Sequence, residues 1–202
     1  AMMTNGTSGN INNIDFVNAS KSLPPYEKIR QVAEAVATAV CEALPNVEYH
    51  TWAELDARTR DLVLAVRKPT PEMVAYFEQV KRRPADVEPY HVHEMTYAGR
   101  IADLQKAPDE VSVVLQAFRI GDLGVCAIPF ESFVEIGLEI KAKSPFSQTF
   151  TASLTNGGYG YLPTVEQHAL GGYETWMGTN NVEIEAATQI VEVLLGMLGE
   201  MK

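Results

Sequence analysis

The sequence predicts an α/β domain, α+β-like in character, in which helices flank a layered domain with a mixed β-sheet. Some segments repeat apolar residues at helical spacing, whereas others are short runs of β-branched and apolar residues bounded by turn residues. The two kinds of segment are interspersed along the chain, which is typical of a layered domain with both element types. With 202 residues, 46% of them hydrophobic, the chain can form one sizeable core.

Four segments have the periodicity of amphipathic helices. They span residues 26–44, 70–83, 90–104 and 182–201. The second has the clearest start, because Thr70 can cap the helix and Pro71 occupies its first position. A shorter apolar stripe after Pro129 predicts a further helix.

Four runs predict strands, at residues 61–67, 111–120, 123–128 and 150–154. Gly121 and Asp122 separate the second run from the third, so these two are expected to form a hairpin. Residues 5–13 are dense in Gly, Asn and Ser, which predicts a loop.

Charge and composition exclude several classes of protein. The net charge is −10, with 26 acidic and 16 basic residues, so no basic face for nucleic acid is expected. No apolar run reaches the length of a transmembrane helix, and no signal peptide is recognisable. Cys41 and Cys126 each lie in an apolar run, which predicts two buried free thiols, although a disulfide between them stays open.

Three residues stand where chemistry could occur. Glu131 follows a predicted strand and starts a helix, which exposes a carboxylate at a sheet edge; an acidic residue there also simply suits the helix dipole. Tyr161 and Tyr173 each follow a pair or triplet of glycines, and such segments can also be tight turns with packed aromatic rings. His91 and His93 are expected on a helix, where side chains two apart diverge, so a metal site there is not favoured.

Three motifs together resemble the neutral/alkaline, non-lysosomal ceramidase family. That family carries a Pro-Gly-Glu turn, then Gly-Tyr-x-x-Thr, then a Tyr-Glu-Gly-like segment, in this order. The matching segments here are Pro129-Phe130-Glu131, Gly160-Tyr161-Leu162-Pro163-Thr164 and Gly171-Gly172-Tyr173-Glu174. The opening segment 5–12 is similar to the Gly-Asp turn near the family's nucleophile. The resemblance covers residues 111–176 and 4–16, and residues 26–105 match only loosely.

The resemblance implies a zinc-dependent amide hydrolase acting on a small amphiphilic N-acyl compound such as ceramide, in sphingolipid metabolism. Glu131 and Tyr161 would be zinc ligands, and Tyr173 would be catalytic, stabilising the developing oxyanion. The family's two histidine ligands lie upstream of this chain. Residues 3–202 would therefore be the C-terminal half of a ceramidase-like catalytic domain, with the N-terminal half as partner, little zinc bound and no activity alone. Ala1-Met2 is expected to be a cloning remnant, and a secreted or periplasmic location would follow from the family.

Two departures bear on the substrate. Phe130 stands where the family usually has Gly, and Asn10 where Asp is usual. The nucleophile-turn residue stays unassigned, with Ser8 a chemically possible substitute.

Alternatives to an amide hydrolase remain. One is a non-catalytic binding or structural relative of the ceramidase fold. The other is an unrelated α/β domain, in which Glu131, Tyr161 and Tyr173 would lie far apart. A half-domain would expose apolar surface, so we expect either a homodimer or larger assembly, or a fragment produced by proteolysis or an early start site; a monodisperse monomer in light scattering would count against this expectation.

Overall fold

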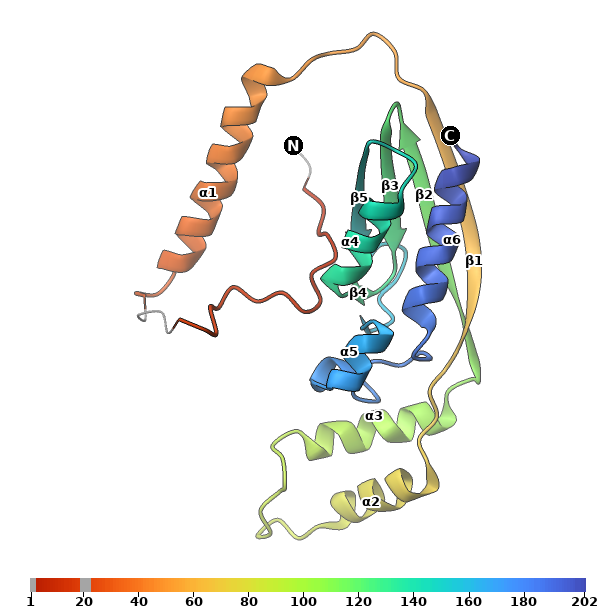
Figure 1. Cartoon of the computed structure of the whole chain (residues 1–202). Coiled ribbons are helices and arrows are strands. Elements are labelled where there is room, and N and C mark those ends of the chain that lie inside the picture. Colours follow the sequence, from red (N-terminus) through yellow and green to blue (C-terminus); the bar gives the residue numbers. More distant parts are fainter. Residues whose placement is uncertain (1–2, 19–22) are drawn as a thin grey trace. The chain divides into compact units, whose positions relative to one another are not determined.

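The computed structural model describes residues 3–18 and 23–202 (Figure 1). The expected remnant Ala1-Met2 lies outside the described residues. Contacts divide the chain into two compact units, Asn12–Ala53 and a larger unit that combines Ala1–Ile11 with Glu54–Lys202. The larger unit contains the sheet and all the candidate residues.

A four-stranded mixed sheet confirms the predicted fold class. Its order is β1-β2-β3-β5, with the first two pairings antiparallel and β3–β5 parallel. The strands are β1 Leu55–Ala65, β2 Glu110–Ile120, β3 Leu123–Ile128 and β5 Gln148–Ser153. The first strand begins earlier than predicted because its polar start also pairs with β2, at Leu55 opposite Ile120. The predicted hairpin at Gly121-Asp122 is confirmed.

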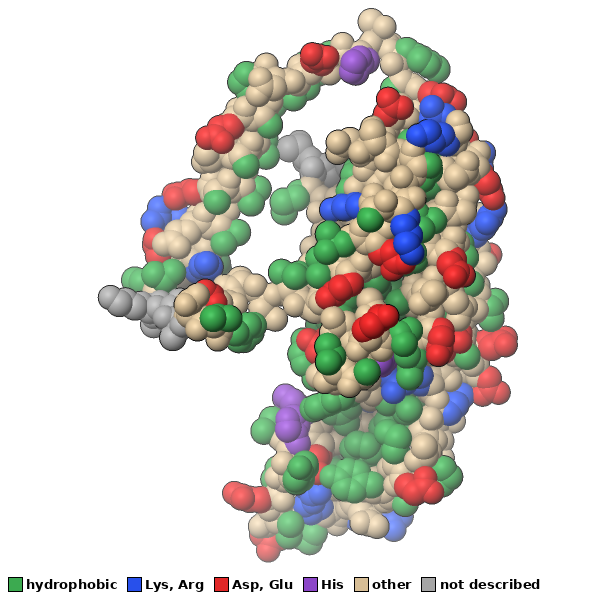
Figure 2. All heavy atoms as spheres, in the orientation of Figure 1, with side chains coloured by type: hydrophobic (Ala, Val, Ile, Leu, Met, Phe, Trp, Pro, Cys, Tyr) green, Lys and Arg blue, Asp and Glu red, His purple; other side chains and the backbone are tan. Residues whose placement is uncertain are grey.

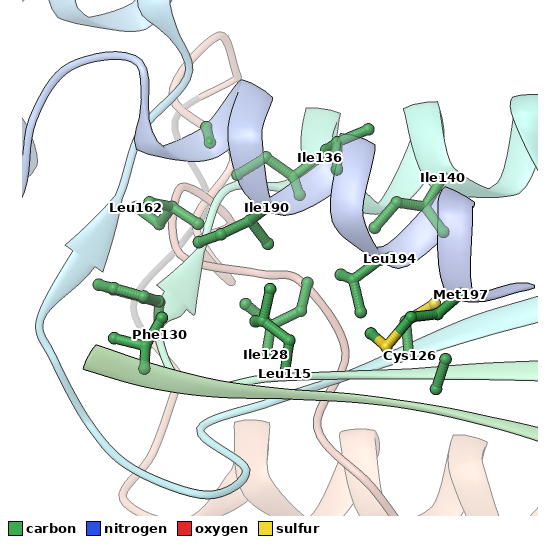
Figure 3. Packing of buried hydrophobic residues seen from close by; sticks show 14 of the residues in the cluster. Leu115, Cys126, Ile128, Phe130, Ile136, Ile140, Leu162, Ile190, Leu194 and Met197 are labelled. Carbon is green, nitrogen blue, oxygen red and sulfur yellow. The ribbon is translucent and has the colours of Figure 1, made fainter. Parts of the chain in front are cut away.

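Two helices, α4 Val134–Lys143 and α6 Ala186–Glu200, form the layer on one face of this sheet (Figure 1). Ile190, Leu194 and Met197 of α6 point toward the buried side chains of the strands (Figure 3). On the other face of the sheet Val114, Phe118 and Val125 are only half-buried. The helical periodicity of residues 182–201 therefore correctly predicted which side chains of α6 lie in the core.

An α-helical hairpin joins β1 to β2. It consists of α2 Pro71–Arg82 and α3 Glu94–Lys106. The Thr70 hydroxyl accepts a hydrogen bond from the Met73 amide at 3.2 Å, which is the predicted cap. Because α3 begins later than predicted, His91 and His93 precede it, and their ring centroids are 5.2 Å apart. The prediction that these two rings diverge on a helix was wrong.

A buried carboxylate ties the hairpin together. Glu94 is 5% exposed and bonds to Arg83, to the Tyr76 hydroxyl and, at 3.1 Å, to the Tyr90 amide. Arg83, followed by the Tyr76 hydroxyl, lowers the pKa of Glu94 from 4.5 to about 2.

This pKa gives a prediction for acid stability. A folded-state pKa below the unfolded value means that the Glu94 carboxylate stabilises the fold above pH 4.5 and loses that effect between pH 4.5 and 2. We expect Glu94→Gln to lower the melting temperature at pH 7 and to flatten its fall between pH 4.5 and 2, measured by circular dichroism. Glu88→Gln, at an exposed position in the same connection, is the matched control. Equal pH slopes for Glu94→Gln and the control would contradict the assignment.

Several short elements were not predicted. These are β4 Glu131–Ser132, β6 Tyr161–Leu162, α5 Val165–Leu170 and a 3₁₀ turn at Tyr173–Thr175. Each is too short to give a periodic pattern. They nevertheless carry the three candidate residues.

The smaller unit contains α1 Glu27–Ala43 and a 3₁₀ turn at Leu44–Asn46. The predicted helix is confirmed, but none of its residues is buried, and its apolar stripe, including Val32 and Val36, is exposed. Cys41 is consequently exposed, which corrects its predicted burial, whereas Cys126 is buried as predicted; both thiols are free. Within the described residues, no helix is long and apolar enough to cross a membrane.

Candidate active site

The small parallel pair β4–β6 brings Glu131 and Tyr161 together. Glu131 is paired with Tyr161 and Ser132 with Leu162. Side chains alternate between the faces of a strand, and Ser132 and Leu162 are both buried. Glu131 and Tyr161 therefore share the opposite, more accessible face.

The backbone before Tyr161 requires a glycine. Gly160 has φ +95°, and a Cβ there would lie 2.5 Å from the Thr179 carbonyl oxygen. The Tyr161 amide donates to that same carbonyl at 3.1 Å. Close backbone contact with the 176–182 loop thus sets the position of Tyr161.

Tyr173 reaches the same place from the 3₁₀ turn Tyr173–Thr175. Its hydroxyl lies 3.3 Å from the Tyr161 hydroxyl, and the rings meet edge to face at 5.7 Å. Tyr173 is 50% exposed, so its hydroxyl is accessible from solvent. All three candidate residues therefore converge, as expected for a ceramidase-like chain and not for an unrelated α/β domain.

The Tyr161 phenol is held in its neutral form. Burial raises its pKa above the ordinary value, and the hydrogen bond with Tyr173 and the nearby Glu131 carboxylate raise it further. An anionic Tyr161 beside Glu131 would place two negative charges together. A cation bound between the two oxygens would remove that repulsion.

Phe130 does not crowd this face. Its side chain is completely buried in the core (Figure 3), and its ring centroid lies 5.6 Å from that of Tyr159. Phe130 is buried in the core, whereas Glu131 lies on the more accessible face of β4, so the bulk of Phe130 does not occupy that face. The departure from the family's glycine is thus absorbed by the core.

The opening segment lies directly beside β4. The Gly9 amide donates to the Ser132 carbonyl at 2.7 Å, and a Cβ on Gly9 would approach the Glu131 carbonyl oxygen to 2.6 Å. The Asn10 amide group accepts from the Val134 amide and donates to Glu135, both at 2.9 Å. Within the part of the chain that the structure describes, the Ser8 hydroxyl bonds only to its own turn, at the Gly6 carbonyl and the Asn5 side chain.

The donors fit part of a zinc site. A carboxylate and a phenol oxygen are ligands that zinc accepts. Among residues 3–18 and 23–202, however, no group of three or more His, Cys, Asp or Glu side chains could hold a metal ion. Glu131 and Tyr161 supply oxygen atoms of the kinds that zinc accepts, and two such groups alone do not make up a zinc site.

Comparison with known proteins supports the fold. No protein-family model and no curated protein matches the sequence. Among solved structures, the chain matches neutral ceramidase from Pseudomonas aeruginosa with a TM-score of 0.63 and 15% identity, over 98% of this chain and 36% of that one. The fold is similar to part of a neutral ceramidase. A ceramidase complexed with C2 matches with a TM-score of 0.56 and 14% identity, over 87% and 34%. The two structural matches confirm, for the fold, the ceramidase resemblance seen in the sequence. The chain spans about a third of the length of these two ceramidases.

The sequence did not predict two residues that support the site from behind. Asn180, 1% exposed, donates to the Tyr161 carbonyl at 3.1 Å and accepts from the Arg67 guanidinium at 2.8 Å. Arg67 also donates to the Thr175 carbonyl at 2.8 Å. An arginine and an asparagine 113 positions apart in the sequence give no local pattern that could have revealed this link.

Proposed function

We propose that this chain is the C-terminal half of the catalytic domain of a zinc-dependent amide hydrolase that resembles neutral ceramidase and cleaves an N-acyl amide such as that of ceramide. The observation that carries the proposal is the convergence of Glu131, Tyr161 and Tyr173 on one accessible face, with the two hydroxyls 3.3 Å apart. The shared fold supports it.

Each residue has a chemical role in this proposal. Glu131 and Tyr161 would hold the metal, and the β4–β6 pairing fixes the separation of their backbones. Zinc supplies a Lewis acid that polarises the amide carbonyl and activates water. Tyr173, whose side chain is half exposed beside Tyr161, would stabilise the negative charge that develops on the carbonyl oxygen.

The remaining ligands would come from the N-terminal half. Two donors rarely hold zinc, so this chain alone should bind it weakly and be inactive. A role in sphingolipid metabolism and a secreted or periplasmic location would accompany this function.

A non-catalytic relative is the second candidate. Asn10, which replaces the family's usual Asp, bonds to Glu135 and to the start of α4. That residue therefore has a structural role here. Zinc content separates a hydrolase from a non-catalytic relative.

The test is the zinc stoichiometry of the complete gene product, measured by elemental analysis. We expect one zinc per chain, lost in Glu131→Gln and retained in Glu166→Gln, a matched change at an exposed carboxylate. Absence of zinc from the unmodified protein would contradict the proposed hydrolase function and favour a binding or structural role.

A further inference from the structure

An aromatic pocket lies between α2, α3 and the 176–182 loop. Its volume is about 570 Å³, within the range of small-molecule sites. Its apolar wall is formed mainly by Met73, Tyr76, Phe77, Tyr97, Ile101 and Trp176. Figure 2 shows hydrophobic side chains gathered over this region of α2 and α3.

The wall suits an apolar or aromatic group. The Tyr97 and Trp176 rings meet edge to face at 5.3 Å, and those of Tyr76 and Phe77 at 5.1 Å. Fixed aromatic rings contribute a large apolar contact area with little entropy to lose on binding.

One charged group in the lining has no partner of opposite charge. Arg67 is half-buried, and no carboxylate of the described residues lies within 4 Å of it in an ion pair. Among the described residues, the Arg67 side chain donates hydrogen bonds only from Nη1, to Thr175 and Asn180, so Nε and Nη2 have no acceptor in that part of the chain. The other charged group of the lining, Glu94, is already neutralised by Arg83.

The pocket is connected to the candidate active site. Asn180 links the Arg67 guanidinium to the Tyr161 carbonyl, with hydrogen bonds of 2.8 and 3.1 Å. Thr175, the last residue of the turn that carries Tyr173, and Trp176, which directly follows it, line the pocket. The pocket and the backbone of Tyr161 are therefore linked by hydrogen bonds through Arg67 and Asn180.

We propose that this pocket binds an amphipathic carboxylate, with the carboxylate on Arg67 and the apolar body against the aromatic wall. Guanidinium binds carboxylate with two parallel hydrogen bonds, and a half-buried cation without a counterion favours an anionic group. A cationic ligand would meet Arg67 and be repelled. If the bound molecule is also the substrate of the proposed hydrolase, it would be an N-acyl amino acid, which contains both an amide and a carboxylate. This identification of the substrate rests on the proposed function.

The test is equilibrium binding to this chain without metal. The chain has two tryptophans, so W52F leaves Trp176 as the only one and makes its fluorescence a reporter of the pocket. We expect N-hexanoylphenylalanine to change this fluorescence saturably and to bind at least tenfold more tightly than its uncharged methyl ester. Equal binding of acid and ester, tighter binding of decyltrimethylammonium, or no saturable change would each overturn the proposal.

Two substitutions test the role of charge. Arg67→Met should reduce the preference for the acid to within twofold, although it also removes the bonds to Asn180 and Thr175. Met73→Glu leaves those bonds intact and places a carboxylate in the pocket wall, so it should weaken acid binding at least tenfold and ester binding much less. An unchanged preference in Met73→Glu would contradict the proposal even if Arg67→Met unfolds.

The outcome is independent of the proposed hydrolase. Acid-selective binding by this chain, together with a complete protein free of zinc, would retain the pocket and remove the hydrolase. Zinc in the complete protein, together with equal binding of acid and ester, would support the proposed hydrolase and reject the proposed carboxylate pocket.

Discussion

Tyr173→Phe is expected to lower the kcat of the complete enzyme about 10²–10³-fold on an N-acyl amide, because it removes one donor to the transition-state oxyanion. The Tyr173 ring packs edge to face on Tyr161, and phenylalanine keeps that packing. Zinc content and KM should therefore change little. The measurement is steady-state hydrolysis together with elemental analysis of the same preparation.

Tyr161→Phe is the matched comparison. It removes a hydroxyl from the same pair, 3.3 Å away, but one proposed to hold zinc, so the metal content should fall along with activity. Retained zinc in Tyr161→Phe, or full activity in Tyr173→Phe, would show that the two roles are assigned incorrectly.

Phe130→Ala is expected to lower the free energy of unfolding by about 3–5 kcal/mol. Phe130 is completely buried and packs near Tyr159, in the bend that directly precedes Glu131. Truncation would leave a large cavity in the core and remove an aromatic contact.

Urea unfolding followed by circular dichroism measures this change. Leu138→Ala, at a side chain that is 56% exposed on α4, is the control and should alter the unfolding free energy by about 0.5 kcal/mol or less. A loss below about 1 kcal/mol for Phe130→Ala would mean that the core collapses around the missing ring.

Long elements of the fold could be predicted because their patterns are local. Thr70 caps α2 where the sequence placed it, and the apolar stripe of residues 182–201 became the buried face of α6. The hairpin at Gly121-Asp122 likewise followed from turn chemistry between two apolar runs.

The features that the sequence did not predict depend on contacts between residues that are far apart along the chain. The polar start of β1 is a strand only because it pairs with β2, and β4 and β6 have two residues each. The burial of Cys41 was inferred from apolar neighbours, but an apolar stripe does not show whether anything covers it.

The candidate site was predictable as a set of residues from the motifs around Glu131, Tyr161 and Tyr173. Their convergence depends on a parallel pairing across 30 residues and on Asn180, which no motif marked. Their roles in metal binding and catalysis stay predictions.

The contacts of Asn10 limit how this chain can evolve. Its amide group donates to one oxygen of Glu135, and Gln167 donates to the other at 3.0 Å. An aspartate at this position would set two carboxylates against each other and offer no donor to Glu135. Positions 10 and 135 are therefore expected to covary among homologues, and a mutation that places aspartate at position 10 would be tolerated only after Glu135 had changed.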